Sequence, residues 1–156
     1  MRAIVQAFKY GGHQTLGGAL AARLSDHPHL RLADVDIVVP VPLHPWRRLT
    51  RGFNQAERLA RSLGLPVLQA LSRQHWTASQ AGLPAALRRG NVRAAFAIAA
   101  GLTASRASLH DRLAGARVLL VDDVVTTGAT LSACAQALRV AGVRDVRAAT
   151  IARTPR

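Results

Sequence analysis

The apolar positions of this chain fall into two patterns, and the first of them predicts strands. Short runs rich in Val, Ile, Leu and Ala are typical of strands buried in a sheet. Such runs lie at 35–41, 66–71, 94–98, 117–122 and 145–151. The run at 117–122 is the clearest of them, and the prolines that follow 35–41 end that strand.

The second pattern has helical spacing. Residues 54–63 place their apolar side chains on one face, and Asn54 is a suitable N-cap for this helix. The spacing of apolar residues over 130–141 predicts a further helix that ends at Gly142. Two shorter helices are predicted on either side of the Gly11-Gly12 break, at 2–9 and 15–25.

The remaining long stretch, 73–93, has no clean period and contains glycine and proline. We expect a long loop there, with a helical turn at 85–89. Loops of this length in compact domains are usually functional.

The order of these elements predicts an α/β fold. A strand, a helix and a strand follow one another from 117 to 151, which implies parallel strands with helices packed on the sheet. We expect an open, mostly parallel, twisted sheet flanked by helices. The 156 residues contain no repeat and no linker, so 1–156 is read as a single domain.

Composition and the pattern of the N-terminal residues indicate a cytoplasmic domain. No apolar run approaches the roughly 20 residues of a membrane-spanning helix, so no membrane insertion is expected. The N-terminal residues lack the pattern of a secretory signal. Cys134 is the single cysteine, which leaves no internal disulfide, and its place in a predicted helix indicates a small core residue.

The formal net charge of +13 has two interpretations. Scattered arginines can simply reflect an Arg-rich composition. Arginines gathered in loops favour a polyanionic partner such as phosphate, pyrophosphate or nucleic acid.

Residues 118–130, VLLVDDVVTTGAT, combine three features that suit a sugar phosphate. An apolar strand leads to Asp122 and Asp123, at the strand end where ligands bind in open α/β sheets. Two adjacent carboxylates can accept hydrogen bonds from vicinal hydroxyls. The turn that follows offers backbone N–H groups, threonine hydroxyls and a helix N-terminus to an anion. An ordinary strand–loop–helix joint explains any two of these features, but not all three together.

This segment resembles the 13-residue signature of the type I phosphoribosyltransferases. The resemblance implies that Asp122 and Asp123 contact the ribose hydroxyls of phosphoribosyl pyrophosphate. It also implies that the 5-phosphate lies in the turn formed by Thr126, Thr127, Gly128, Ala129 and Thr130. The segment is not a Walker A loop, because Lys9 is the only lysine.

A second anion site is predicted between the first strand and the helix at 54–63. Its charge comes from Arg47, Arg48 and Arg51, and Gly52 allows a close backbone approach. A solvated basic loop is the alternative. In the type I phosphoribosyltransferases the corresponding loop holds pyrophosphate.

Four blocks in order resemble the ComF family, a phosphoribosyltransferase-like group tied to DNA uptake. They are 8–12, 40–61, 75–96 and the 118–130 segment. Long members of this family begin with a four-cysteine zinc region that this sequence lacks, so no structural zinc is expected. The segment 75–91 resembles the loop that closes over substrate, and its candidate contacts are Thr77, Ser79, Gln80, Arg88, Arg89 and Asn91. Among these, Arg88 and Arg89 are the expected catalytic residues.

Two functions follow from the resemblance. The first is an enzyme that binds phosphoribosyl pyrophosphate with Mg²⁺, held mainly by the substrate, and transfers the phosphoribosyl group to an acceptor. The second is an accessory protein that binds single-stranded DNA, or DNA-uptake proteins, through its basic surface. A regulatory protein that senses phosphoribosyl pyrophosphate without turnover combines the two. The acceptor is not readable from the sequence.

Overall fold

The computed structural model describes residues 22, 24, 27, 30–43, 53–73, 95–99 and 106–154. Three parallel strands form its central sheet in the order β1-β4-β5, with β4 in the middle. These strands are β1 (Ile37–Pro40), β4 (Arg117–Val125) and β5 (Asp145–Arg153). Two short strands, β2 (Leu71–Arg73) and β3 (Phe96–Ile98), form a separate antiparallel pair.

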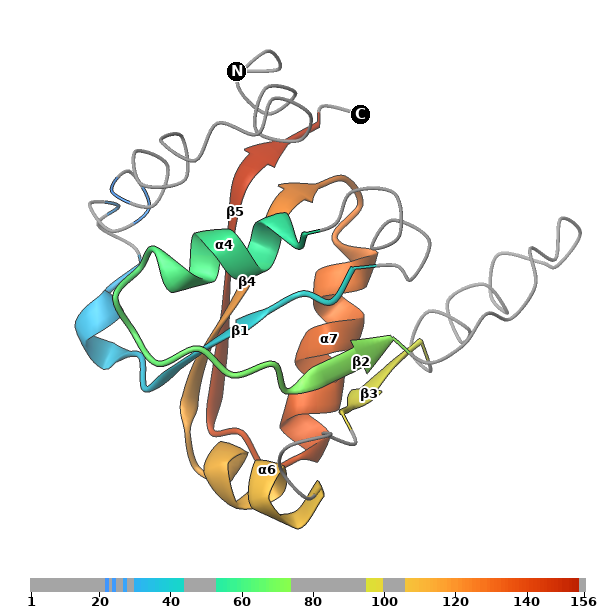
Figure 1. Cartoon of the computed structure of the whole chain (residues 1–156). Coiled ribbons are helices and arrows are strands. Elements are labelled where there is room, and N and C mark those ends of the chain that lie inside the picture. The colour runs from blue at the N-terminus through green and yellow to red at the C-terminus, as the bar shows by residue number, and fades with distance from the viewer. Residues whose placement is uncertain are drawn as a thin grey trace, which may run out of the picture.

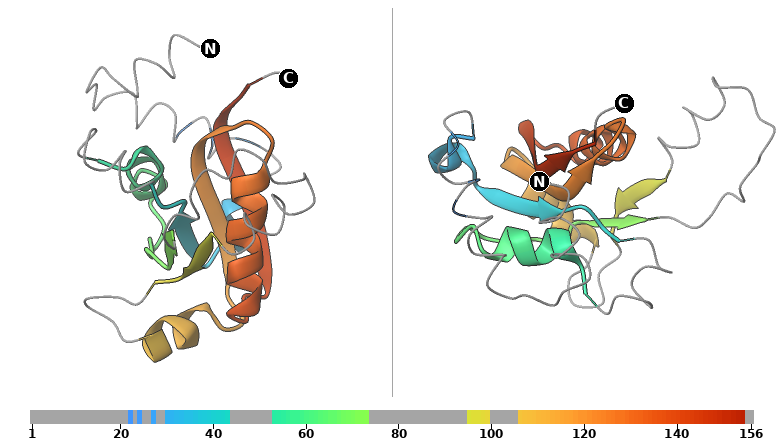
Figure 2. Two further views of the ribbon diagram at one scale, coloured as in Figure 1. Left: turned by 90° about the vertical axis from the view of Figure 1, so that its right-hand side faces the viewer. Right: turned by 90° about the horizontal axis from the view of Figure 1, so that it is seen from above.

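Helices cover both faces of the sheet, which confirms the predicted fold class (Figure 1). Seen from above, α4 (Gln55–Arg61) and α7 (Ala129–Val140) lie on opposite sides of the strands (Figure 2). The β2–β3 pair and α6 (Arg106–Leu113) share the face of α7, where their apolar side chains join one core cluster. A second cluster fills the space between α4 and the other face.

Local sequence explains where α4 begins and where α7 ends. The Asn54 side chain accepts the N–H of Ala56 at 3.1 Å, so the predicted N-cap of α4 is confirmed. Gly142 follows α7 with a φ of +86°, a left-handed conformation that ends the helix as expected.

The strand predicted at 66–71 was wrong. Val67 makes only a single parallel bridge, to Val38, and the strand that forms, β2, starts at Leu71. Pro66 has no N–H to donate, and the N–H of Ala70 bonds to the carbonyl of Leu68 at 2.9 Å. That tight bond turns the chain away from β1 after one bridge.

Of the remaining predicted elements, one is confirmed and several lie outside the described residues. The strand at 94–98 is confirmed as β3, and α6 lies in a stretch for which no element was predicted. The predicted helix at 2–9 and most of the helix at 15–25 lie outside the described residues, as does the turn at 85–89.

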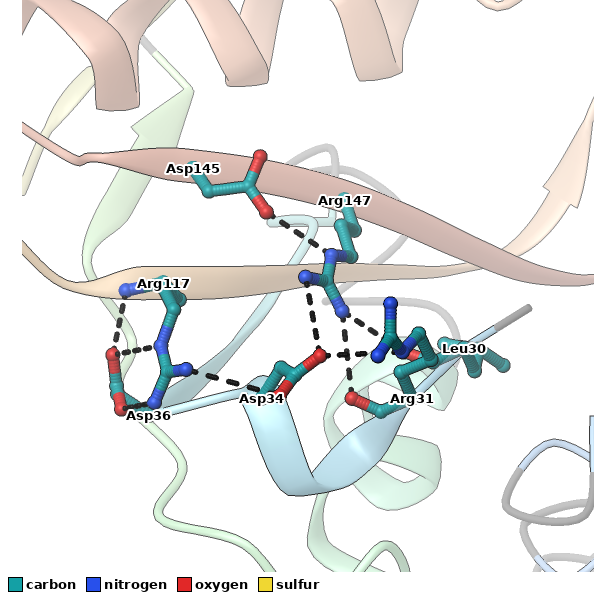
Figure 3. Close-up of polar contacts among 7 residues, drawn as sticks. All are labelled: Leu30, Arg31, Asp34, Asp36, Arg117, Asp145 and Arg147. Atoms are coloured by element: carbon teal, nitrogen blue, oxygen red, sulfur yellow. Dashed lines mark hydrogen bonds and ion pairs between the residues drawn. The ribbon is translucent and has the colours of Figure 1, made fainter. Parts of the chain in front are cut away.

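The amino ends of the three parallel strands carry a cluster of ion pairs (Figure 3). Arg117 binds both carboxylate oxygens of Asp36, at 2.8 and 3.1 Å, and its backbone N–H adds a bond of 2.8 Å. Arg147 pairs with Asp145 at 3.0 Å and lies 3.8 Å from Asp34. Asp34 belongs to the short 3-10 helix η1 (Leu32–Asp34), so the cluster ties η1 to the sheet.

Candidate functional site

The 118–130 segment reaches the carboxyl edge of the sheet, where β4 runs longer than predicted. The strand was expected to end at residue 122, before a loop, but it continues to Val125. Its pairing with β5 extends to the pair Val125–Arg153, and the N–H of Thr154 donates to the carbonyl of Val125 at 3.0 Å. Asp122 and Asp123 therefore both belong to a hydrogen-bonded strand.

Consecutive strand residues point to opposite faces, and this separates the two carboxylates. Leu120 belongs to the core cluster of α7, whereas Val121 belongs to the cluster of α4. Continuing that alternation, Asp122 lies on the α7 face and Asp123 on the α4 face. A ligand that contacts both must lie across the edge of β4 that β1 leaves uncovered after the pair Pro40–Val121.

The environment of Asp122 is marked by two further groups. Its Oδ1 accepts the N–H of Asp123 at 2.8 Å. Cys134 of α7 has a pKa raised to about 12, first by burial and then by the negative charge of Asp122, while Arg73 acts in the opposite direction. The Cys134 thiol therefore stays protonated at neutral pH and is a core residue, as expected. Asp122 and Arg73 both lie near enough to influence it.

The turn after β4 has the features of an anion site. Gly128 has a φ of +78° and directly precedes the first residue of α7, a twelve-residue helix. The first-turn N–H groups of a helix have no intrahelical acceptor and carry a partial positive charge. Thr127 Oγ1 accepts one of them, from Ala129, at 3.4 Å. The side chains of Thr126 and Thr127 are exposed, so their hydroxyls are open to a ligand.

The second predicted site cannot be placed in the same way, because Arg47, Arg48, Arg51 and Gly52 lie outside the described residues. Both ends of that segment are nevertheless fixed at the carboxyl edge. The N–H of Val41 donates to the carbonyl of Val121 at 2.9 Å, and Asn54 Nδ2 donates to the carbonyl of Val41 at 3.1 Å. The described residues on either side of 44–52 therefore meet at Val41, next to the carboxyl end of β1.

The candidate contacts of the 75–91 segment, including Arg88 and Arg89, also lie outside the described residues. The strands that flank the segment are paired, with Arg73 opposite Phe96. The guanidinium of Arg73 lies 5.4 Å from the centre of the Phe96 ring.

The sequence analysis did not identify two further candidate residues, Arg73 and Gln55. Arg73 acts on the same Cys134 thiol as Asp122 does, and no sequence signal placed it there because the pairing of β2 with β3 was not predicted. Gln55 is 1% exposed, the only buried polar or charged residue in the described part of the chain. Its signal was present in the sequence, since a glutamine at this position falls on the apolar face of α4.

The described residues offer few ligands to a metal ion. They contain no group of three or more His, Cys, Asp or Glu side chains placed to hold one. Asp122 and Asp123 can each give a carboxylate oxygen, the type of ligand that Mg²⁺ prefers. These residues fit an ion that a phosphorylated substrate holds for the most part.

Among the described residues, no helix is long and apolar enough to span a membrane.

Comparisons with known proteins agree with this geometry. The chain is 34% identical to competence protein F of Haemophilus influenzae over 96% of its own length and 66% of that protein. It is 29% identical to competence protein ComFC of Streptococcus pneumoniae, over 98% of the chain and 63% of that protein. The chain thus spans less than two thirds of the length of these curated relatives.

Solved structures show the same fold. Glutamine phosphoribosylpyrophosphate amidotransferase from B. subtilis matches 94% of the chain, and 30% of its own length, at a TM-score of 0.56 and 20% identity. The sequence pattern of the family described as phosphoribosyl transferase domain matches residues 48–156, well over half of the chain. The chain therefore belongs to the phosphoribosyl transferase domain family and, within it, to the ComF group.

Proposed function

We propose that this chain binds phosphoribosyl pyrophosphate with Mg²⁺ and transfers the phosphoribosyl group to an acceptor, releasing pyrophosphate. The observation that carries the proposal is the continuous path from Asp122 and Asp123 to the turn at Gly128. A ribose lying across the end of β4 meets one carboxylate on each face. Its 5-phosphate then reaches the first turn of α7, which favours an anion.

In this reaction, the bond between C1 of the ribose and the pyrophosphate oxygen breaks, and the acceptor forms the new bond to C1 while losing a proton. Mg²⁺, held mainly by the substrate with Asp122 and Asp123 as the available carboxylates, would supply positive charge to the pyrophosphate. Asp122 and Asp123 orient the ribose, and Arg88 and Arg89 stabilise the leaving group. The exposed turn at Thr126 and Thr127 anchors the other end of the substrate.

Calorimetric titration tests this assignment. Phosphoribosyl pyrophosphate with Mg²⁺ is titrated into the wild type, Asp122→Asn, Asp123→Asn and the double variant. A hydrogen bond to a charged group is worth about 1.5–3 kcal/mol, so each single variant should bind about tenfold more weakly or worse. Asp111→Asn, which removes the same charge from an exposed position on α6, is the matched control and should bind as the wild type does.

Equal binding by the wild type and the double variant would overturn the proposed ribose site. If binding is established, a screen of nucleobases and amines for pyrophosphate release tests the transfer step. The absence of release across a broad panel would leave binding without turnover, as in a protein that senses phosphoribosyl pyrophosphate.

A second function is favoured by the names of the relatives, which are competence proteins. We propose as the alternative that the basic chain, at +13, binds single-stranded DNA or DNA-uptake partners. Such binding should weaken steeply as salt rises, because counterions are released from the phosphates. Fluorescence anisotropy with a labelled oligonucleotide at low and high salt measures this. A flat signal at low salt would eliminate the DNA-binding role.

A further inference from the structure

Gln55 has a buried side-chain amide whose nitrogen makes no hydrogen bond in the fold. The side chain is 1% exposed, and its Nε2 has no hydrogen-bond acceptor in the structure that we describe. A buried donor left without a partner destabilises a protein and is uncommon in native structures. Retaining it therefore calls for an explanation beyond packing.

The position of Gln55 points to the carboxyl edge of the sheet. It is the first residue of α4, and its neighbour Asn54 fixes that end of the helix to Val41 at the end of β1. Residues four apart lie on the same helix face, so Gln55 shares the face of Leu59, which packs in the core cluster with Val121.

Gln55 therefore lies on the α4 side of β4, one helical turn closer to the carboxyl edge than Leu59. Asp123 continues β4 toward the same edge and on the same face. A glutamine has three rotatable bonds before its amide group, so the amide can turn toward this edge without moving the helix.

We propose that Gln55 donates its amide N–H to the pyrophosphate group of the bound substrate, an inference that rests on the proposed function. The 5-phosphate occupies the α7 face, at the turn before Ala129, and the ribose crosses the end of β4. The substituent at C1 is then on the α4 face, beside Asp123 and Gln55. A pyrophosphate oxygen supplies the acceptor that the buried amide lacks, so binding relieves a cost carried by the ligand-free chain.

The test compares three ligands on two variants. Gln55→Met keeps a side chain of similar length and removes both polar groups, and Gln55→Leu is a second substitution should the first fold poorly. Wild type and variants are titrated with Mg²⁺–pyrophosphate, ribose 5-phosphate and Mg²⁺–phosphoribosyl pyrophosphate, and their thermal midpoints are measured without ligand.

We expect affinity for both pyrophosphate-bearing ligands to fall about tenfold or more, because the lost bond is to a charged group. Affinity for ribose 5-phosphate should not change. The ligand-free thermal midpoint should stay level or rise, since an unpartnered donor has been removed. Gln69→Met is the control, because that exposed amide already donates to Glu57 at 2.7 Å, and it should leave all three affinities unchanged.

Unchanged pyrophosphate affinity in the Gln55 variants, with phosphoribosyl pyrophosphate bound normally, would overturn this inference alone. An equal loss for ribose 5-phosphate would also overturn it, because the effect would then be general. A wild type that binds none of the three ligands would overturn the proposed function itself.

Discussion

Gly128 adopts a left-handed conformation at the point where β4 passes into α7, with a φ of +78°. A Cβ there would meet only a methyl group of Val125, at 3.9 Å, so the conformation and not crowding requires glycine. Gly128→Ala should therefore cost about 1–2 kcal/mol of unfolding free energy. In the proposed site the turn offers its N–H groups to the 5-phosphate, so the variant should also bind phosphoribosyl pyrophosphate more weakly. Urea unfolding and calorimetry measure the two effects.

Gly64 provides the matched control. Its φ is +70°, and a Cβ there would meet nothing within 4 Å. Gly64→Ala should destabilise the fold by a similar amount without any change in ligand affinity. Equal losses of affinity in both variants would show that instability, and not the turn, weakens binding.

At this scale the sequence predicted where the candidate residues fall in the fold better than how their side chains are arranged. Asp122, Asp123 and the turn through Thr130 do lie together at the carboxyl edge, as their order in the chain indicated. The split of the two carboxylates between opposite faces was not predicted, because the strand was expected to end at residue 122. Only the partner strand, β5, reveals that the pleat continues through both residues.

At the scale of elements, charged pairs hold η1 and the residues that follow it to the strands. One of these pairs, Asp36–Arg117, depends on pH. Hydrogen bonds from Arg117 lower the pKa of Asp36 from 3.8 to about 2. The pKa of the Asp36 carboxyl is lower in the folded chain than in the unfolded chain. The Asp36–Arg117 pair therefore stabilises the fold above pH 4, and this contribution is lost as pH falls from about 4 to 2. Asp36→Asn should be less stable at neutral pH and should show a flatter fall in stability across that range.

Urea unfolding midpoints measured from neutral pH down to pH 2 provide the readout. Asp111→Asn, on the exposed side of α6, is the control and should follow the wild-type curve. If Asp36→Asn and the wild type lose stability in parallel below pH 4, the Asp36–Arg117 pair does not set the acid sensitivity.

Elements with a strong local signal were predicted, and those made by tertiary contact were not. Val118 to Val121 form an unbroken apolar run, and α4 has both a cap and an apolar face. In α6, by contrast, only Leu109 and Leu113 are buried among the residues whose burial is known, too few to establish a period. The strand β2 depends on its pairing with β3, which is distant in the sequence. No local pattern could reveal such a pair.

Across the whole molecule, the β2–β3 pair stands apart from the central sheet. Arg73 and Phe96 are direct partners, so the chain leaves and returns at adjacent points. Replacing residues 74–95 with Asn-Gly should close a two-residue hairpin and keep the buried residues of the core cluster, at the loss of the partly buried Ala95. Loop-closure entropy favours the shorter chain by up to about 2 kcal/mol. Because Arg88 and Arg89 are removed, pyrophosphate release should be abolished.

Urea unfolding and a pyrophosphate-release assay separate these outcomes. A conservative comparison is the full-length Arg88→Gln/Arg89→Gln variant, which should be folded and similarly inactive. Failure of the shortened chain to fold would mean that residues 74–95 contribute more to the core than the partial burial of Ala95. Retained release would show that the catalytic contribution comes from elsewhere.

The adjacency of Arg73 and Phe96 also makes this region exchangeable. Any insert whose ends are spaced for an antiparallel pair can be accommodated without altering β1, β4 or β5. Substitution and length change can therefore accumulate between the two strands while the turn at Gly128 stays fixed. Chimeras that carry the corresponding segment of a relative should keep the scaffold of this chain. Under the proposed function they should also release pyrophosphate at the rate of the donor, which would separate the inheritance of binding from that of reactivity.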